Sequence, residues 1–119
     1  MKEMANQKIF QMEFREIYSA YLKKVERKGH SKQELDQVIL WFTGHDQESL
    51  QQCLNTPITM EEFYQQVPMM NPNAPLITGV ICGIRVEEIS DPLMQKIRYL
   101  DKLVDEVAKG KKMENILRH

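Results

Sequence analysis

The sequence has few cysteines, no long apolar run and no excess of charge of either sign. Its two cysteines, Cys53 and Cys82, are too few for a disulfide framework. No apolar stretch approaches the roughly 18 residues that suggest a membrane span. The opening residues, MKEMANQKIF, show neither the apolar region nor the cleavage site of a secretory signal. We therefore expect a cytoplasmic protein with reduced thiols and no membrane partner.

Charge argues against a dedicated nucleic-acid binder. The chain carries 16 basic and 17 acidic side chains, for a formal net charge of -1, whereas nucleic-acid binders usually have a strong basic excess. The densest basic run lies between Lys23 and Lys32. We interpret it as the solvated last turn of a helix, where cations complement the helix dipole. Nucleic-acid contact through this run is a weaker alternative.

Length and composition predict one globular domain. The chain has 119 residues, of which 42% are apolar and 28% charged. That is enough to bury a hydrophobic core without metals or disulfides. We expect a single helical domain over residues 1–119, with fraying confined to 1–8 and 118–119.

Helix start and stop signals are clear. Ser31–Glu34 and Thr59–Glu62 are capping boxes, and Asp46 and the pair Asp91-Pro92 are further N-terminal signals. Apolar residues recur every three or four positions after these starts, as in amphipathic helices. Glycines that suit helix ends stand at Gly29, Gly44 and Gly110. These signals predict an all-α fold, a compact bundle of about five to six helices.

The segment from Leu76 to Ile89 is ambiguous. Its apolar residues share a face either as a helix or as a strand, and two glycines weaken both interpretations. We favour a helix, on which Gly79 and Gly83 would form a smooth patch for close approach of another helix. The alternative is a short β element at 8–12 and 78–86, because a lone strand needs a partner and only 8–12 offers one.

No strong catalytic motif is present, so no catalytic residue is assigned. The sequence has no nucleophile elbow, phosphate-binding loop or paired-cysteine motif. Its histidines, His30, His45 and His119, lie far apart. We therefore predict no metal site and no cofactor.

Several residues remain as candidate binding residues. Cys82 lies between glycines and could be a nucleophile activated by Arg85, although a small buried core cysteine is the favoured interpretation. Glu87, Arg98 and Asp101 belong to a stretch of mixed charge. Paired carboxylates there could bind a ligand, but surface ion pairs such as Arg98 with Asp101 are favoured.

Two further candidates stand where one helix gives way to the next. Trp41 falls off the main apolar stripe of its helix and either closes the core or lines a pocket or partner surface. We favour the core. His45 beside Asp46 could act as a base with an orienting carboxylate. A turn in which Asp46 caps the next helix is the favoured explanation. Cys53, on the face of Leu50 and Leu54, is predicted to be core.

Motifs spread over the chain resemble one known family. They are Lys28-Gly29-His30-Ser31-Lys32, Trp41-Phe42-Thr43-Gly44, Asn71-Pro72, Ile77 to Glu87, Asp91-Pro92-Leu93-Met94, Ile97 to Glu106 and Ala108-Lys109-Gly110-Lys111. This set resembles the bacterial family DUF2200, a domain of unknown function, over Ile9 to Arg118. The resemblance implies a bacterial cytosolic origin and no particular activity. His45 and His30 stand where that family tends to have tyrosine and arginine, which weakens a catalytic role for either.

The sequence leaves two functional hypotheses. The first is a non-enzymatic helical module that binds another protein or itself, since candidate surface features are present without a catalytic constellation. The second is a small-molecule or metal-dependent enzyme that uses Cys82, Arg85 and Glu87 near Trp41.

Overall fold

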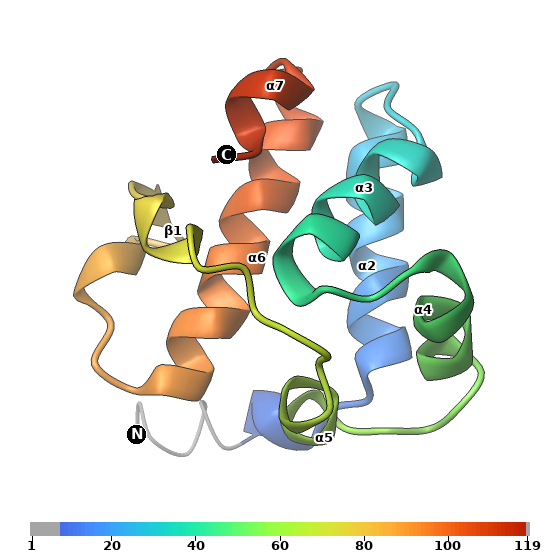
Figure 1. The fold of residues 1–119 in the computed structure, drawn as a ribbon. Coiled ribbons are helices and arrows are strands. Elements are labelled where there is room, and N and C mark those ends of the chain that lie inside the picture. Colours follow the sequence, from blue (N-terminus) through green and yellow to red (C-terminus); the bar gives the residue numbers. More distant parts are fainter. Residues whose placement is uncertain (1–7, 119) are drawn as a thin grey trace.

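The computed structural model describes residues 8–118. It is mostly helical with one short hairpin, which confirms the predicted fold class (Figure 1). Residues 8–11 form a first helical turn. The elements that follow are α2 (Phe14–Arg27), α3 (Lys32–Thr43), α4 (Gln47–Leu54), α5 (Met60–Gln65), the 3-10 turn η1 (Ala74–Leu76), β1 (Val80–Ile81), β2 (Ile84–Arg85), the 3-10 turn η2 (Val86–Glu88), α6 (Pro92–Ala108) and α7 (Met113–Ile116).

The helices begin where the sequence predicts. The side chain of Ser31 accepts a hydrogen bond from the amide of Glu34, whose carboxylate accepts one from the amide of Ser31 in return. A second capping box opens α5 at Thr59. Asp46 and Asp91 cap α4 and α6 with their carboxylates. Each cap satisfies amide groups that the first helical turn leaves without partners.

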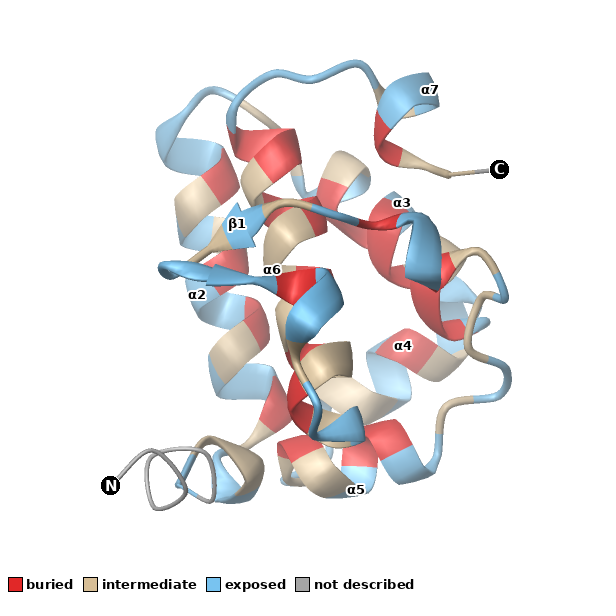
Figure 2. Ribbon diagram, turned by 90° about the vertical axis from the view of Figure 1, so that its left-hand side faces the viewer, coloured by how far each residue is buried: buried red, intermediate tan, exposed pale blue. Residues whose placement is uncertain are grey.

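Helix α6 is the centre of the fold. It packs against α2, α3, α5 and α7, and also against η2 and β1. The apolar spacing after Asp91-Pro92 predicts a buried stripe of Leu93, Ile97, Leu100, Leu103, Val104 and Val107. All of these are buried except Leu93, which is half-buried. Figure 2 shows the buried positions of α6 and α3 facing the interior, where the buried apolar side chains form one contiguous cluster.

Buried polar contacts tie the helices together. Asp36 of α3 is only 2% exposed and accepts hydrogen bonds from the Tyr18 hydroxyl of α2 and from Lys32 Nζ, both at 2.6 Å. Near the C-terminus, Arg118 Nη2 lies 2.9 Å from Glu106 Oε2 of α6. These pairs give the buried carboxylates their hydrogen-bond partners. Each missing partner would destabilise the fold by about 1–3 kcal/mol.

The segment from Leu76 to Ile89 is not an α-helix, so the favoured interpretation was wrong. The predicted short β element at 78–86 is present, but as two short strands rather than one. Val80 pairs with Arg85 and Ile81 with Ile84 in an antiparallel hairpin. Its two turn residues, Cys82 and Gly83, have φ of 53° and 77°. Positive φ at both positions matches the two-residue turn that best suits strand twist, and it is incompatible with a helix.

The N-terminal segment does not pair with this hairpin. Residues 8–11 are helical, and the extended backbone at Glu13 forms an isolated bridge with Thr59 instead. The predicted β element at 8–12 is therefore wrong, because the segment 78–86 supplies its own partner strand. Residues 1–7 and 119, where fraying is expected, lie outside the described residues. None of the described helices is long and apolar enough to cross a membrane.

Two helix-ending glycines give a matched test of how closely the chain at Met69 packs against the end of α3. Gly44 and Gly29 have similar φ, +77° and +84°, but a Cβ at Gly44 would lie 2.8 Å from the Met69 carbonyl oxygen, whereas none of the atoms around Gly29 would come within 4 Å. Both alanine variants should lose about 1 kcal/mol for the left-handed backbone. Gly44→Ala should lose a further ~1–3 kcal/mol from the clash. Urea unfolding measures both, and equal losses would contradict the packing at Met69.

Candidate functional site

Three of the predicted binding residues form a chain of contacts between the hairpin and α6. Arg98 Nη1 lies 2.9 Å from Asp101 Oδ2 and 3.7 Å from Cys82 Sγ. Asp101 Oδ1 also accepts a hydrogen bond from the Tyr21 hydroxyl of α2 at 2.5 Å. Burial raises the pKa of Tyr21 well above its ordinary value, so the hydroxyl remains a donor. The favoured Arg98–Asp101 ion pair is thus present, and it holds Arg98 beneath the hairpin turn.

Arg85 and Glu87 form a second, more exposed pair. Arg85 Nη1 lies 3.6 Å from Glu87 Oε2, and Glu87 Oε1 accepts a hydrogen bond from the Gly79 amide at 3.0 Å. Hydrogen bonds from the backbone amides of Glu87 and Gly79 lower the pKa of the Glu87 carboxyl. The Glu87 carboxylate therefore links η2 to the start of the hairpin at Gly79, while Arg85 is exposed on β2.

The hairpin region exposes apolar side chains. Leu76, Val80 and Ile84 are 59%, 50% and 46% exposed. Cys82 is a free thiol at the exposed turn. The expectation of a buried core cysteine was therefore wrong, because Cys82 lies in the turn of the hairpin and not in the core. We call the exposed residues of this segment, Leu76, Val80, Cys82, Ile84 and Arg85, the hairpin surface. By the pairing register, Val80 and Arg85 face one side of the hairpin and Ile84 faces the other. Figure 2 shows the hairpin as exposed.

Trp41 and His45 come from a different part of the molecule. Trp41 is half-buried on α3 and packs against the core cluster, in keeping with the favoured core interpretation. Its carbonyl oxygen accepts a hydrogen bond from Asn71 Nδ2 at 3.1 Å. His45 follows α3 and belongs to a cavity beside α4. The structure therefore divides the predicted binding residues between two regions.

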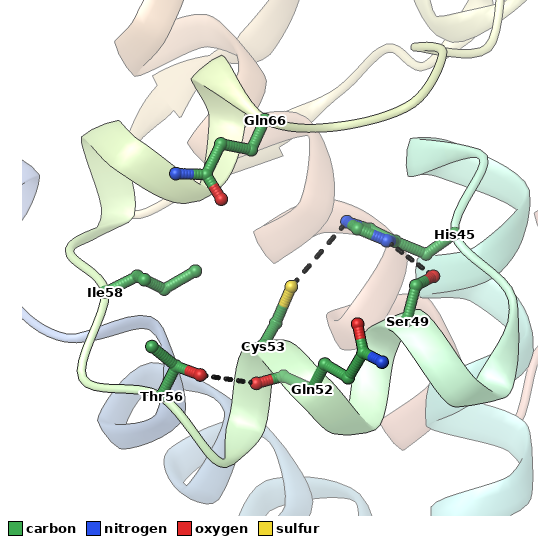
Figure 3. A pocket seen from close by; sticks show the side chains of 7 residues that line it. All are labelled: His45, Ser49, Gln52, Cys53, Thr56, Ile58 and Gln66. Atoms are coloured by element: carbon green, nitrogen blue, oxygen red, sulfur yellow. Dashed lines mark hydrogen bonds between the residues drawn. The ribbon is translucent and has the colours of Figure 1, made fainter.

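The cavity beside α4 has a volume of about 270 Å³. Figure 3 shows Cys53 and His45 pointing toward each other, with Ile58 and Gln66 approaching from the segment that leads into α5 and from the end of α5. Its lining residues are His45, Ser49, Gln52, Cys53, Thr56, Ile58 and Gln66. Only His45 was predicted as a binding residue.

His45 is buried and held in one orientation. It is 8% exposed, its ring stacks on Phe63 with centroids 5.5 Å apart, and Nδ1 lies 2.9 Å from Ser49 Oγ. Burial lowers its pKa, although the negative charge of Asp46 opposes that change. Asp46 itself caps α4 by accepting from the Ser49 amide at 2.8 Å. The favoured turn-and-cap explanation of Asp46 therefore holds, and Ser49 rather than Asp46 orients the imidazole.

Cys53 corrects a second expectation. It is half-buried rather than part of the closed core, and it lines the cavity. Its Sγ lies 3.9 Å from His45 Nε2, and burial raises the pKa of the thiol. The available sequence signal covers only part of this group. Ser49 and Cys53, four residues apart, share one face of α4, whereas His45 precedes the cap of that helix.

The described residues hold no metal-ligand cluster, and neither cavity includes the hairpin candidates. No three or more His, Cys, Asp and Glu residues among positions 8–118 are grouped closely enough to share a metal ion. A second cavity of about 280 Å³ lies between α5 and the start of α6, lined by Glu61, Tyr64, Gln65, Pro92, Leu93 and Lys96. Neither cavity is lined by Cys82, Arg85 or Glu87.

The fold and these two regions define a small helical protein with one exposed hairpin. The chain belongs to the family DUF2200, described as "Uncharacterized protein conserved in bacteria", whose model matches residues 8–118. It is also similar to a solved crystal structure, "uncharacterized protein SP1917", with a TM-score of 0.89 and 47% sequence identity over 93% of this chain and 91% of that chain. The comparison with curated proteins found no match.

The lowered pKa of His45 has a defined effect on stability. The folded state binds a proton at His45 less readily than the unfolded state does. The contribution of His45 to the free energy of unfolding is therefore complete above its ordinary pKa of 6.5, and it is lost as the pH falls through the lowered pKa. We expect the His45 ring signal to titrate below 6.5 by NMR. His45→Phe keeps a ring against Phe63, and its unfolding free energy should fall less than that of the unchanged protein between about pH 7 and pH 5. Parallel curves for the two proteins would contradict this assignment.

The two cysteines should differ in reactivity. Cys82 is exposed, whereas Cys53 is half-buried with a raised pKa, and the thiolate is the reactive form. At neutral pH, Cys53→Ser should retain the fast phase of reaction with a chromogenic disulfide and Cys82→Ser only the slow one. Equal rates in the folded state would show that Cys53 is more open than the structure indicates.

Proposed function

We propose that this chain is a non-enzymatic helical module of the bacterial cytosol that associates with a second copy of itself through the hairpin surface. The observation that carries the proposal is the exposure of Leu76, Val80 and Ile84 within nine consecutive residues, 76–84. Single exposed apolar side chains are normal, but several on one short projecting segment are typical of interaction sites. Val80 and Ile84 lie on opposite faces of the hairpin, so a second copy that packs beside it can contact both.

A second copy fits this surface by charge and by backbone. Arg85 and Glu87 place opposite charges beside the apolar residues. A two-fold axis brings the same patch from both copies together, so that Arg85 of one copy can face Glu87 of the other. Within the described residues, β2 pairs only with β1. The outer edge of β2 therefore offers backbone groups to a second strand.

The placement of Cys82, Arg85 and Glu87 supports the non-enzymatic alternative over the enzymatic one. These residues lie at the exposed hairpin turn, on β2 and on η2, outside both cavities described above. An enzyme site normally surrounds its substrate in a concave pocket that excludes water. Contact with a flat partner surface suits their arrangement better.

Self-association through the hairpin surface is tested by sedimentation equilibrium over micromolar concentrations. We expect a reversible dimer in the unchanged protein. Ile84→Lys combined with Val80→Lys should raise the dissociation constant at least about tenfold, which corresponds to ~1.4 kcal/mol. Met69→Lys is the matched control, because Met69 is 67% exposed and lies outside the hairpin surface.

Three results would contradict the proposal. They are a monomer throughout the concentration range, a dimer that the double variant leaves unchanged, and a dimer that Met69→Lys disrupts equally. Binding of a different protein by a strictly monomeric chain would replace the second copy as the partner. Circular dichroism of each variant separates loss of association from loss of fold.

A further inference from the structure

We infer that one end of the molecule, formed by two basic segments, binds the phosphate backbone of double-stranded DNA. The turn that follows α2 and the turn that follows α6 lie at this same end of the fold (Figure 1). We call residues 23–36 and 105–118 together the basic end. It contains none of the residues of the hairpin surface, so binding there is independent of the proposed self-association.

Side-chain contacts hold the two segments side by side. Asp105 of α6 pairs with Lys24 Nζ of α2 at 3.1 Å and with Lys109 Nζ at 3.0 Å. A Cβ at Gly110 would lie 3.6 Å from His30 Nε2, so the turn after α6 passes beside the turn after α2. The fold therefore joins two basic runs that lie far apart in the sequence.

The basic end is positive although the whole chain is not. Residues 23–36 and 105–118 hold nine basic and six acidic side chains, for a formal charge of +3. The remaining residues hold seven basic and eleven acidic side chains, for a formal charge of -4. The near-zero charge of the chain is therefore the sum of two oppositely charged regions. A polyanion is attracted to one of them and repelled by the other.

Most carboxylates of the basic end are buried or already paired. Asp105 contacts two lysines, and Glu106, which is only 6% exposed, contacts one lysine and one arginine. Each of these two carboxylates therefore leaves one positive charge in excess. The exposed acidic residues of the basic end are Glu26 and Glu114, whereas seven of its basic residues are exposed. Its solvent-facing charge is thus mainly positive.

Four of the exposed cations have no structural partner that explains them. Within residues 8–118, no carboxylate lies within 4 Å of the charged groups of Lys23, Arg27, Lys28 or Lys112. Lys112 also stands at the N-cap of α7 without a side-chain cap, a position where serine, threonine, aspartate or asparagine is preferred. These cations are therefore available to phosphate groups.

The composition of the basic end favours a duplex over a single strand or a membrane. Neither of its two segments contains a phenylalanine, tryptophan or tyrosine, and single-stranded bases bind mainly by stacking on such side chains. None of the large apolar side chains that are exposed in the described residues lies in the basic end, whereas membrane-surface segments insert apolar side chains. Lysines acting as point charges suit phosphates of any sequence.

The experiment is a titration of labelled duplex DNA with the full-length protein, followed by fluorescence anisotropy at several salt concentrations. We expect a dissociation constant of roughly 10⁻⁴–10⁻⁶ M at physiological salt, as is typical of sequence-independent contacts. With about four to six phosphate contacts, the logarithm of the association constant should fall against the logarithm of salt concentration with a slope of about -4 to -5.

Two double variants separate the basic end from net charge. Arg27→Glu with Lys112→Glu removes one unpaired cation from each segment, and should weaken binding at least about tenfold and make the salt slope shallower by about 2. Lys8→Glu with Arg15→Glu is the matched control, because it changes the net charge equally at exposed positions near the other end of α2. It should change the affinity by less than about twofold at physiological salt. Circular dichroism checks that both variants fold.

The opposite outcomes are equally defined. Absence of an anisotropy change at low salt would exclude binding to DNA, and equal losses in the two double variants would exclude the basic end as its location. Polyglutamate that competes as well as unlabelled duplex would indicate an acidic protein as the partner. Vesicles with anionic lipid that bind the protein when the duplex does not would indicate a membrane surface.

Discussion

Burial of α6 is the constraint on which the remaining structure depends. A helix of 17 residues whose buried positions include Met94, Ile97, Tyr99, Leu103 and Ala108 cannot hide its apolar surface with one neighbour. It is therefore enclosed by α2, α3, α5 and α7, with η2 and β1 closing a further side. Because each of these elements is too short to bury its own apolar face alone, each gains most of its stability from this shared core.

The same helix positions the hairpin. Asp101 joins Tyr21 of α2 to Arg98, and Arg98 lies against Cys82 at the turn. A Cβ at Gly79 would lie 3.0 Å from the Lys102 side chain, so the hairpin passes close to α6. These contacts fix the turn while β2 remains at the edge. Val80 and Ile84 are therefore exposed on a hairpin that contacts α6 through its turn and its base.

Local signals in the sequence were sufficient for the helices, but not for the regions between them. Capping boxes at Ser31 and Thr59 act within four residues, so the sequence alone predicts those starts. The hairpin depends on a positive φ at Cys82, which a cysteine rarely adopts and no local pattern announces. The cavity was missed for a different reason. Ser49 and Cys53 share a face of α4, but His45 lies before that helix, and Gln66 joins them only through the packing of α5.

The two cysteines show how tertiary surroundings give one residue type different chemistry. Cys82 stands at an exposed turn, with its sulfur 3.7 Å from the Arg98 guanidinium. Cys53 is half-buried beside the His45 imidazole, and burial raises the pKa of its thiol, which favours the protonated form. From the sequence alone, both cysteines are expected to be reduced and buried in the core. Their neighbours differ too: Cys82 contacts the charged Arg98 at the surface, whereas Cys53 faces His45 across a cavity.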